Sequence, residues 1–191
     1  EVVVSKDPAI LQQADKLFLP GVGTAKEAMA NLIERDLVTQ VSKLTQPVLG
    51  ICLGMQMLAE GSEEAFGSEE TSDSEDTPAI IKTLGLVDGV VAKMDVAPLR
   101  LPHMGWNQVY QGGKPHAMWN GIANGERFYF VHSYYVSSTN PDYAVGFGEY
   151  PQRFTCAVGK ENIFAVQFHP EKSAQAGLQL LSNFVNWKPE Y

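Results

Sequence analysis

The sequence predicts a three-layer α/β fold, in which helices cover both faces of a sheet, and three observations indicate it. In the first sixty residues, short apolar runs alternate with segments of helical periodicity. Residues 47–51 are apolar throughout, as expected of a parallel strand that is buried on both faces. After residue 100 the pattern changes to a series of short strands followed by one helix.

Capping and turn residues set the boundaries in the first part of the chain. Asp7-Pro8 is typical of an N-cap followed by proline at the first helical position. Thr24 and Glu27 have the spacing of a capping box, and Pro20 should end the strand before it. The expected elements are, in order, a strand end at 2–4, a helix from Asp7, a strand at 16–19, a helix from Thr24 to Val41, a strand at 47–51 and a helix at 53–59.

The second half of the chain is predicted to be mainly strands. The expected strands are 108–110, 128–136, 144–150, 154–158 and 163–168, with 159–162 as the hairpin turn between the last two. Ser173 should start the final helix, whose buried face is predicted to carry Leu178, Leu181, Phe184 and Val185.

The net charge of −8 is concentrated in one segment. Eight acidic residues lie between Glu60 and Asp76, and there is no Lys or Arg between Lys43 and Lys82. We interpret residues 62–79 as a flexible, solvated acidic insertion within a single domain that spans residues 1–191. The other 14 acidic residues balance the 14 basic ones, so no basic cluster is available to bind nucleic acid.

The two cysteines, Cys52 and Cys156, cannot form a disulfide framework, and a free thiol fits a reducing cytoplasm. Neither a Cys-x-x-Cys pair nor a histidine cluster is present, so we expect no metal and no cofactor. No apolar run approaches the ~18 residues of a membrane-spanning helix, and the start of the chain lacks the pattern of a signal peptide.

The motif Gly50-Ile51-Cys52-Leu53-Gly54 stands where a buried strand should pass directly into a helix. It is the thiol counterpart of the Gly-x-Ser-x-Gly nucleophile elbow, a strained turn in which glycine allows close approach of the neighbouring elements. Cys52 would project from the sheet at a helix N-terminus, which should favour the thiolate. Taken alone, the motif also fits a small buried cysteine at a strand–helix junction.

The segment Phe168-His169-Pro170-Glu171 follows an apolar strand. Alternate residues of an extended chain share a face, and Pro170 disfavours the helical region for His169. His169 and Glu171 should therefore point the same way, with His169 as general base to Cys52 and Glu171 orienting the imidazole ring. A surface histidine at a strand end is the alternative interpretation of this segment alone.

A third motif is the glycine loop Pro20-Gly21-Val22-Gly23-Thr24 before a helix. Such a loop could hold a phosphate, but it lacks the Lys-Ser/Thr of a P-loop and the spacing of a dinucleotide fingerprint. We favour an oxyanion hole that is formed by the backbone amides of Gly21, Val22 and Gly23 together with that of Leu53.

Together these three motifs resemble the class I glutamine amidotransferases. Two further stretches, Pro102-His103-Met104-Gly105-Trp106-Asn107 and Phe130-Val131-His132-Ser133-Tyr134, are similar to one branch of that class. Its members are glutaminase subunits that serve a cyclase in histidine biosynthesis. The resemblance implies a flavodoxin-like fold with a βα unit before the segment that matches Glu1, so we expect this chain to lack the first βα unit.

The resemblance also implies the substrate, the partner and further site residues. Glutamine would be hydrolysed through a thioester on Cys52, and a (β/α)8-barrel cyclase subunit would receive the ammonia in a heterodimer. The residues implied to hold glutamine are Gln56, Glu64, Ser133 and Tyr134, and those at the partner-facing mouth are Trp106, Tyr129 and Lys172. The last three also fit ordinary roles as a core aromatic, a strand aromatic and a surface lysine.

Two other functions remain open for the same residues. A Cys-His-Glu hydrolase that acts alone, such as a γ-glutamyl peptidase, would use the same triad on a peptide in an open cleft. A scaffold subunit would keep the fold with a vestigial triad, which the presence of Cys52, His169 and Glu171 argues against.

Overall fold

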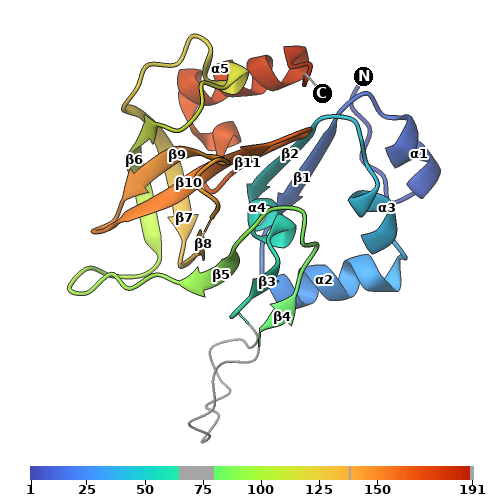
Figure 1. Ribbon diagram of the computed structural model, residues 1–191, viewed down its shortest axis with the longest axis horizontal. Helices are drawn as coiled ribbons and strands as arrows, with labels where there is room; N and C mark the ends of the chain where they lie inside the picture. Colours follow the sequence, from blue (N-terminus) through green and yellow to red (C-terminus); the bar gives the residue numbers. More distant parts are fainter. Residues whose placement is uncertain (65–79, 138, 190–191) are drawn as a thin grey trace, which may run out of the picture.

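The computed structural model describes residues 1–64, 80–137 and 139–189 (Figure 1). Within these residues the main sheet has seven strands in the order β1-β2-β11-β10-β9-β6-β7. They are β1 (Leu17–Gly21), β2 (Val48–Cys52), β6 (His103–Gln111), β7 (Glu126–His132), β9 (Ala144–Glu149), β10 (Arg153–Lys160) and β11 (Ile163–Val166). A smaller sheet has the order β4-β3-β5-β8, with β3 (Gly61–Ser62), β4 (Ile81–Lys82), β5 (Val90–Lys93) and β8 (Tyr134–Ser137).

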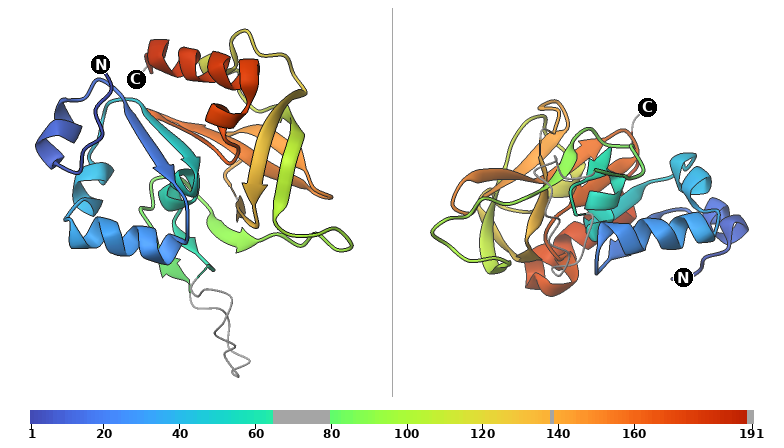
Figure 2. Two further views of the ribbon diagram at one scale, coloured as in Figure 1. Left: turned by 180° about the vertical axis from the view of Figure 1, so that it is seen from behind. Right: turned by 90° about the horizontal axis from the view of Figure 1, so that it is seen from below.

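Helices lie on both faces of the main sheet, as the sequence predicts (Figure 2). The long C-terminal helix covers one face, and α4 with the small sheet covers the other (Figures 1 and 2). The helices are α1 (Pro8–Gln13), α2 (Ala25–Glu34), α3 (Val38–Ser42), α4 (Leu53–Leu58) and α5 (Ala174–Asn186), with 3-10 turns η1 (Ala117–Trp119) and η2 (Pro170–Lys172).

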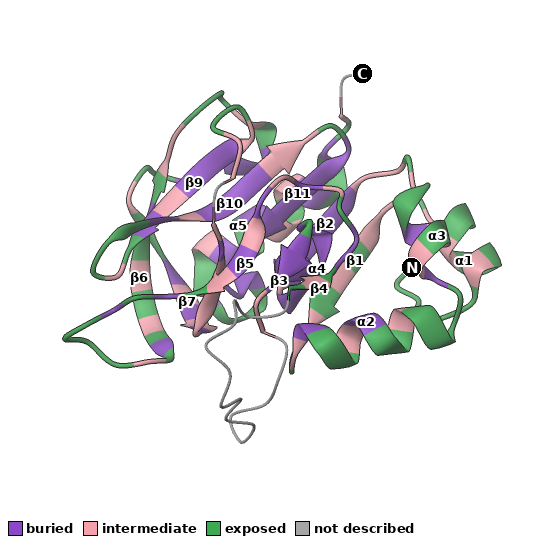
Figure 3. Ribbon diagram, turned by 60° about the horizontal axis from the view of Figure 1, so that its bottom comes forward, coloured by how far each residue is buried: buried purple, intermediate pink, exposed green. Residues whose placement is uncertain are grey.

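The strands β1, β2 and β11 are parallel, and β2 and β11 are buried on both faces (Figure 3). Alternate residues of each strand point to opposite faces of the sheet and pack into two different cores. Leu49 of β2 and Phe164 of β11 belong to the core under α5, whereas Val48 and Ala165 belong to the core under α2 and α4. This burial on both faces explains why residues 47–51 read as a continuous apolar run.

Both predicted N-caps are confirmed. The Asp7 side chain accepts a hydrogen bond from the Ala9 amide, with Pro8 in the first turn of α1. Thr24 and Glu27 form a complete capping box at the start of α2. Pro20, however, lies inside β1 and does not stop it. Since β1 is an edge strand that pairs only with β2, the missing amide hydrogen of proline costs no ladder bond.

The N-terminal strand end predicted at residues 2–4 is wrong. Val2, Val3 and Val4 are 88%, 60% and 99% exposed and lie outside any helix or strand. Valine has high strand propensity, but a strand also needs a neighbour to pair with, and none of the described residues pairs with this run.

The single helix predicted from Thr24 to Val41 is two helices, α2 and α3. Asp36 between them has a φ of 54°, which no α-helix accommodates. Leu37 and Val41 still pack into the core with Met29. The apolar residues of the two short helices therefore have the spacing that one long helix would have.

The buried face of α5 is also different from the predicted one. Leu178 and Val185 are exposed at 60% and 61%, whereas Gly177, Leu180 and Phe184 are buried. Of the four predicted residues, Phe184 is buried as predicted and Leu181 is half-buried against the same core, so the prediction is wrong for Leu178 and Val185. Gly177, which packs closely against the Pro170 carbonyl, was not counted as a packing position.

Ser62, the first residue of the segment predicted to be a flexible insertion, is instead fully buried in β3. Residues 65–79 lie outside the described part of the chain. The predicted strand 128–136 is interrupted at Ser133, where β7 of the main sheet ends and β8 of the small sheet follows. Among the residues described, no helix combines the length and the apolar character needed to cross a membrane.

Candidate active site

The glycine motif forms the strained turn expected of a nucleophile elbow. Cys52 ends β2 and caps α4 with φ 53° and ψ −111°, a conformation that side-chain-bearing residues rarely adopt. A Cβ on Gly54 would lie 1.7 Å from the Leu19 carbonyl oxygen, and one on Gly50 would lie 2.8 Å from Leu58 Cδ1. Both glycines are therefore required by the close approach of strand and helix.

The Cys52 thiol lies between two polar groups. It donates a hydrogen bond to the Val131 carbonyl at 3.9 Å and accepts one from Gln167 Nε2 at 3.7 Å. Burial raises the pKa of the thiol to about 11, against the lowering effects of the Leu53 backbone amide and Gln167. The amide at the helix N-terminus thus favours the thiolate, as predicted, but burial outweighs it, and a neutral thiol needs a base.

His169 is the candidate for such a base. Its Nδ1 lies 2.7 Å from Glu171 Oε1, and because a carboxylate only accepts, Nδ1 carries the proton. His169 Nε2 is buried and has no hydrogen-bond partner among the described residues. An unpaired, unprotonated nitrogen inside a protein is costly, and it is the atom that a general base would present.

His169 and Glu171 point the same way, as predicted, but not through an extended strand. β11 ends at Val166, and Pro170–Lys172 forms the 3-10 turn η2. The backbone of His169 is fixed on both sides. Its amide donates to the Tyr129 carbonyl at 2.9 Å, and its carbonyl accepts from Ser173 Oγ at 2.6 Å.

The predicted oxyanion loop lies beside Cys52. Gly21 pairs with Cys52 in the β1–β2 ladder, and a Cβ on Gly21 would lie 3.0 Å from Leu53 Cβ. Gly23 has a φ of 97°, and Val22 is 88% exposed. The loop therefore brings Gly21, Val22, Gly23 and Leu53 to the same edge of the sheet.

The residues implied to hold glutamine lie near one another, since the Glu64 carboxylate also acts electrostatically on Tyr134. Gln56 Nε2 donates to the Tyr134 carbonyl at 3.1 Å, and Ser133 precedes Tyr134 in the chain. Glu64 lies at the start of α2, where its Oε2 accepts from the Ala25 amide at 3.2 Å. Burial raises the pKa of the Glu64 carboxyl from its ordinary value.

The three residues implied at the partner interface also cluster. Trp106 and Tyr129 are opposite each other on β6 and β7, with ring centroids 6.1 Å apart. Trp106 is 49% exposed, and Lys172 is exposed in η2, the turn that follows His169. Since the Tyr129 carbonyl holds the His169 amide, this surface is joined directly to the candidate base.

Sequence reasoning missed Gln167, His132 and His103. Gln167 is completely buried, and its amide contacts both Cys52 and Gln56. A lone polar residue in the apolar segment 163–168 was the available signal. The two histidines lie within the stretches that carry the family resemblance, and their contacts are described below.

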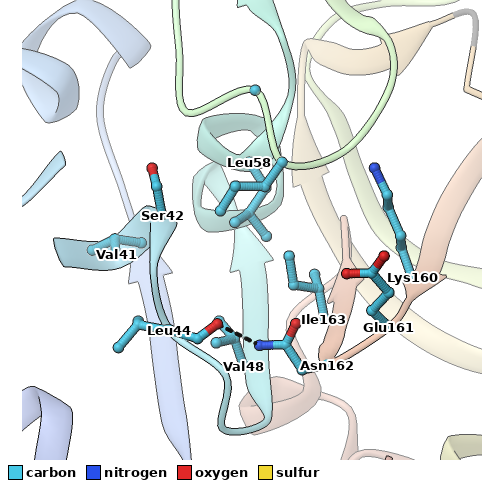
Figure 4. A pocket seen from close by; sticks show the side chains of 11 residues that line it. Val41, Ser42, Leu44, Val48, Leu58, Lys160, Glu161, Asn162 and Ile163 are labelled. Carbon is cyan, nitrogen blue, oxygen red and sulfur yellow. Dashed lines mark hydrogen bonds between the residues drawn. The ribbon is translucent and has the colours of Figure 1, made fainter. Parts of the chain in front are cut away.

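A cavity lined by none of the candidate catalytic residues is shown in Figure 4. It has a volume of about 240 Å³ and surrounds the amino ends of β2 and β11. Its lining includes Val48, Leu58 and Asn162. The candidate catalytic side chains lie at the opposite, carboxyl ends of these strands, where ligands of open α/β sheets normally bind.

The fold and this arrangement of thiol, imidazole and carboxylate agree with the comparison to known families. The model for the class I glutamine amidotransferase family matches residues 2–187, so the chain belongs to that family. Two solved structures share the fold: a glutamine amidotransferase with a TM-score of 0.65 at 15% identity, and one from Thermotoga maritima with 0.56 at 17%. They cover 95% and 92% of this chain, which covers 85% and 64% of theirs.

Within this family, the chain is similar to curated HisH subunits. The chain is 46% identical to the imidazole glycerol phosphate synthase subunit HisH of Thiobacillus denitrificans, over 98% of this chain and 80% of the relative. It is 47% identical to the HisH subunit of Vibrio cholerae, over 96% of this chain and 85% of the relative. The HisH subunit of Yersinia pseudotuberculosis is 48% identical, again over 96% and 85%.

Proposed function

We propose that this protein is the glutaminase subunit of an imidazole glycerol phosphate synthase. It hydrolyses glutamine to glutamate and ammonia and passes the ammonia to a partner. The observation that carries the proposal is the unpaired, buried Nε2 of His169 in the same site as the strained Cys52 elbow. The HisH relatives, at 46–48% identity over nearly the whole chain, support the choice of enzyme.

In the first half of the reaction, Cys52 Sγ attacks the carboxamide carbon of glutamine, and its proton passes to His169 Nε2. Glu171 stabilises the imidazolium through Nδ1. The tetrahedral oxyanion would be held by the amides of Gly21, Val22, Gly23 and Leu53. When the intermediate collapses, His169 returns the proton to the leaving ammonia and a γ-glutamyl thioester remains.

In the second half, His169 Nε2 takes a proton from water, which attacks the thioester carbon. The C–S bond breaks, glutamate leaves, and the thiol takes back its proton. Glutamine would be held by Gln56, Ser133 and Tyr134, with the Glu64 carboxylate facing its α-ammonium group. The contact between Gln56 and the Tyr134 carbonyl supports this grouping.

The partner in this proposal is a (β/α)8-barrel cyclase in a cytoplasmic heterodimer. It would dock on the surface formed by Trp106, Tyr129 and Lys172 and receive ammonia there. The cyclase would use the ammonia on a phosphoribosyl formimino nucleotide, which yields imidazole glycerol phosphate and aminoimidazole carboxamide ribonucleotide. The exposure of Trp106 and the link from Tyr129 to His169 support this surface.

The test is ammonia release from glutamine by the wild-type protein alone, with the cyclase, and with the cyclase plus its nucleotide ligand. We expect the rate to rise by on the order of 10²–10³ with the liganded partner, because glycines flank the exposed Val22 and the oxyanion amides can reorient. Equal rates in all three conditions would reject this activation and leave the triad untouched.

A substitution tests the triad in the same assay. Cys52→Ser should abolish glutamine-dependent turnover and preserve cyclase activity with free ammonia. Steady hydrolysis of γ-glutamyl peptides without a partner would favour a peptidase, and no labelling of Cys52 by an electrophilic glutamine analogue under any condition would favour a scaffold. Cys156 is the internal control, because it is fully buried and burial strongly raises its pKa.

A further inference from the structure

Two buried histidines outside the proposed triad face each other in the main sheet. His103 of β6 and His132 of β7 are opposite in the ladder and are 3% and 5% exposed. His103 stacks on Tyr150, with ring centroids 4.1 Å apart, and on Phe130, at 4.9 Å. Burial lowers the pKa of His103 to about 4 and that of His132 to about 3, so both rings are neutral at pH 7.

The hydrogen bonds of these rings have only one consistent direction. His132 Nδ1 lies 2.8 Å from the Tyr134 carbonyl, which can only accept, so Nδ1 carries the hydrogen and Nε2 is an acceptor. His103 Nδ1, 2.8 Å from His132 Nε2, must then be the donor. His103 Nε2 is therefore an acceptor and faces the Asn107 amide group at 3.2 Å.

A second carbonyl fixes the other end of this chain independently. Asn107 Nδ2 also donates to the Glu149 carbonyl at 2.9 Å, while Asn107 Oδ1 accepts from the Gln108 amide at 2.8 Å. The orientation of the Asn107 amide is thus set by its own contacts, and it offers a hydrogen to His103. Both ends require the same tautomer, with the hydrogen on Nδ1 of each ring.

From Tyr134 the chain continues to the nucleophile. The Tyr134 carbonyl also accepts from Gln56 Nε2, whose other hydrogen goes to Gln167 Oε1 at 3.1 Å. Gln167 must then present its own amino group to Cys52 Sγ, at 3.7 Å. If the Gln167 amide were reversed, its oxygen would face the sulfur and oppose the negative charge that forms there.

We propose that His103 and His132 are positioning residues of the glutaminase site, which hold the Tyr134 carbonyl so that Gln56 and Gln167 aim a hydrogen-bond donor at Cys52 Sγ. The proposal rests on the function proposed above. It joins β6, the strand that carries the exposed Trp106, to the nucleophile through a series of oriented hydrogen bonds. A donor on the sulfur favours the thiolate that attacks glutamine.

The first test uses the wild-type protein and nitrogen-15 NMR of its imidazole rings. We expect both His103 and His132 to be neutral at pH 7, with the hydrogen on Nδ1 and a bare Nε2. A hydrogen on Nε2 of His132, or a charged ring at either position, would overturn the proposal. The measurement requires neither a substitution nor catalytic activity.

The second test compares two substitutions of similar size, His132→Asn and His132→Leu. Asparagine can place its side-chain nitrogen where Nδ1 lies and so retains a donor for the Tyr134 carbonyl, whereas leucine retains no polar group. In the complex with the cyclase, we expect His132→Leu to lower the glutaminase kcat/KM about tenfold, as for the loss of one buried hydrogen bond. We expect His132→Asn to stay within about twofold of the wild type.

The rate of Cys52 alkylation by iodoacetamide at pH 8 measures the reactivity of the thiol, which a change in packing alone would leave unchanged. The alkylation rate should fall about threefold in His132→Leu, which corresponds to a rise of about half a unit in the pKa of the Cys52 thiol. In His132→Asn the rate should stay at the wild-type value. The charged groups that act on the Cys52 thiol, Glu171 and Glu64, are the same in both variants, and so is His169, which acts on position 132. His116→Asn is the control, since this histidine lies against Phe164 and Trp187, away from the chain of hydrogen bonds.

Equal losses in His132→Asn and His132→Leu, or wild-type values in both, would overturn the proposal. If the wild-type complex released no ammonia from glutamine, the proposed function would fail, while the NMR and alkylation results would still decide whether the histidines act on Cys52. If His132→Leu did not fold, the tautomer measurement would decide alone.

Discussion

The two ends of strands β2 and β11 differ in how their polar groups are satisfied. At the amino ends, beside the cavity of Figure 4, Asn162 donates both amide hydrogens, to the Leu44 and Gln46 carbonyls at 2.9 Å each. At the carboxyl ends, His169 Nε2 has no partner among the described residues. The cavity of Figure 4 thus lies at the end whose buried amide is satisfied, and the unpaired atom lies at the other.

This difference shows which observation locates chemistry. A cavity lined by satisfied groups is a packing feature, because nothing in it requires a ligand. A buried polar atom without a partner raises the energy of the resting protein and is relieved only when a substrate or a reacting proton arrives. The predictions below change one end at a time.

The largest effect is expected from the carboxyl end. His169→Gln should lower glutaminase kcat/KM about 10²–10⁴-fold, because it removes the general base and acid. The thermal midpoint should fall only modestly, since Nε2 has no bond to lose and the lost Nδ1 hydrogen bond is to the partly exposed Glu171. Ammonia release from the complex and a melting curve measure the two quantities, and near-wild-type turnover would contradict the assignment of His169.

Alanine substitutions at two glycines compare the cost of a close contact with the cost of backbone strain. Gly54→Ala should destabilise the protein by about 3 kcal/mol and abolish glutaminase activity, because the new Cβ would lie 1.7 Å from the Leu19 carbonyl. Gly85 at the cavity is the matched control. It has a φ of 65° with nothing within 4 Å of an added Cβ, so Gly85→Ala should cost about 1 kcal/mol and spare activity. Denaturant unfolding measures both, and equal losses of stability would show that the contact at Gly54 is not decisive.

The satisfied amide at the amino ends should matter for stability only. Asn162→Leu leaves the Leu44 and Gln46 carbonyls without their donor and should cost about 1–3 kcal/mol in the free energy of unfolding. Glutaminase kcat/KM should remain within about twofold. A loss of activity as large as that of His169→Gln would mean that the two ends of the strands are functionally coupled.

The smallest effect is expected at the cavity wall. Ser42→Ala removes one exposed hydroxyl, which donates to the Val38 carbonyl at 2.9 Å within α3. Stability should change by no more than ~0.5 kcal/mol and activity not at all. A marked fall in activity would indicate that this cavity holds a ligand.

The sequence by itself determined the local features of this protein. The caps at Asp7 and Thr24 depend on residues within one turn, so their pattern is visible in the chain and the structure confirms both. The glycine motif around Cys52 was also visible in the chain, although the contact that requires Gly54 is made with Leu19 on the separate strand β1. The two-sided burial of β2 was visible as an apolar run.

The tertiary structure decided everything that depends on which distant segments meet. The break between α2 and α3, the buried face of α5 and the unpaired residues 2–4 each follow from contacts that periodicity does not encode. The same holds for the state of the site. Burial, a property of the whole fold, outweighs the local helix terminus in setting the pKa of Cys52. The donor on its sulfur comes from Gln167, 115 residues away in the sequence and adjacent only because β11 pairs with β2.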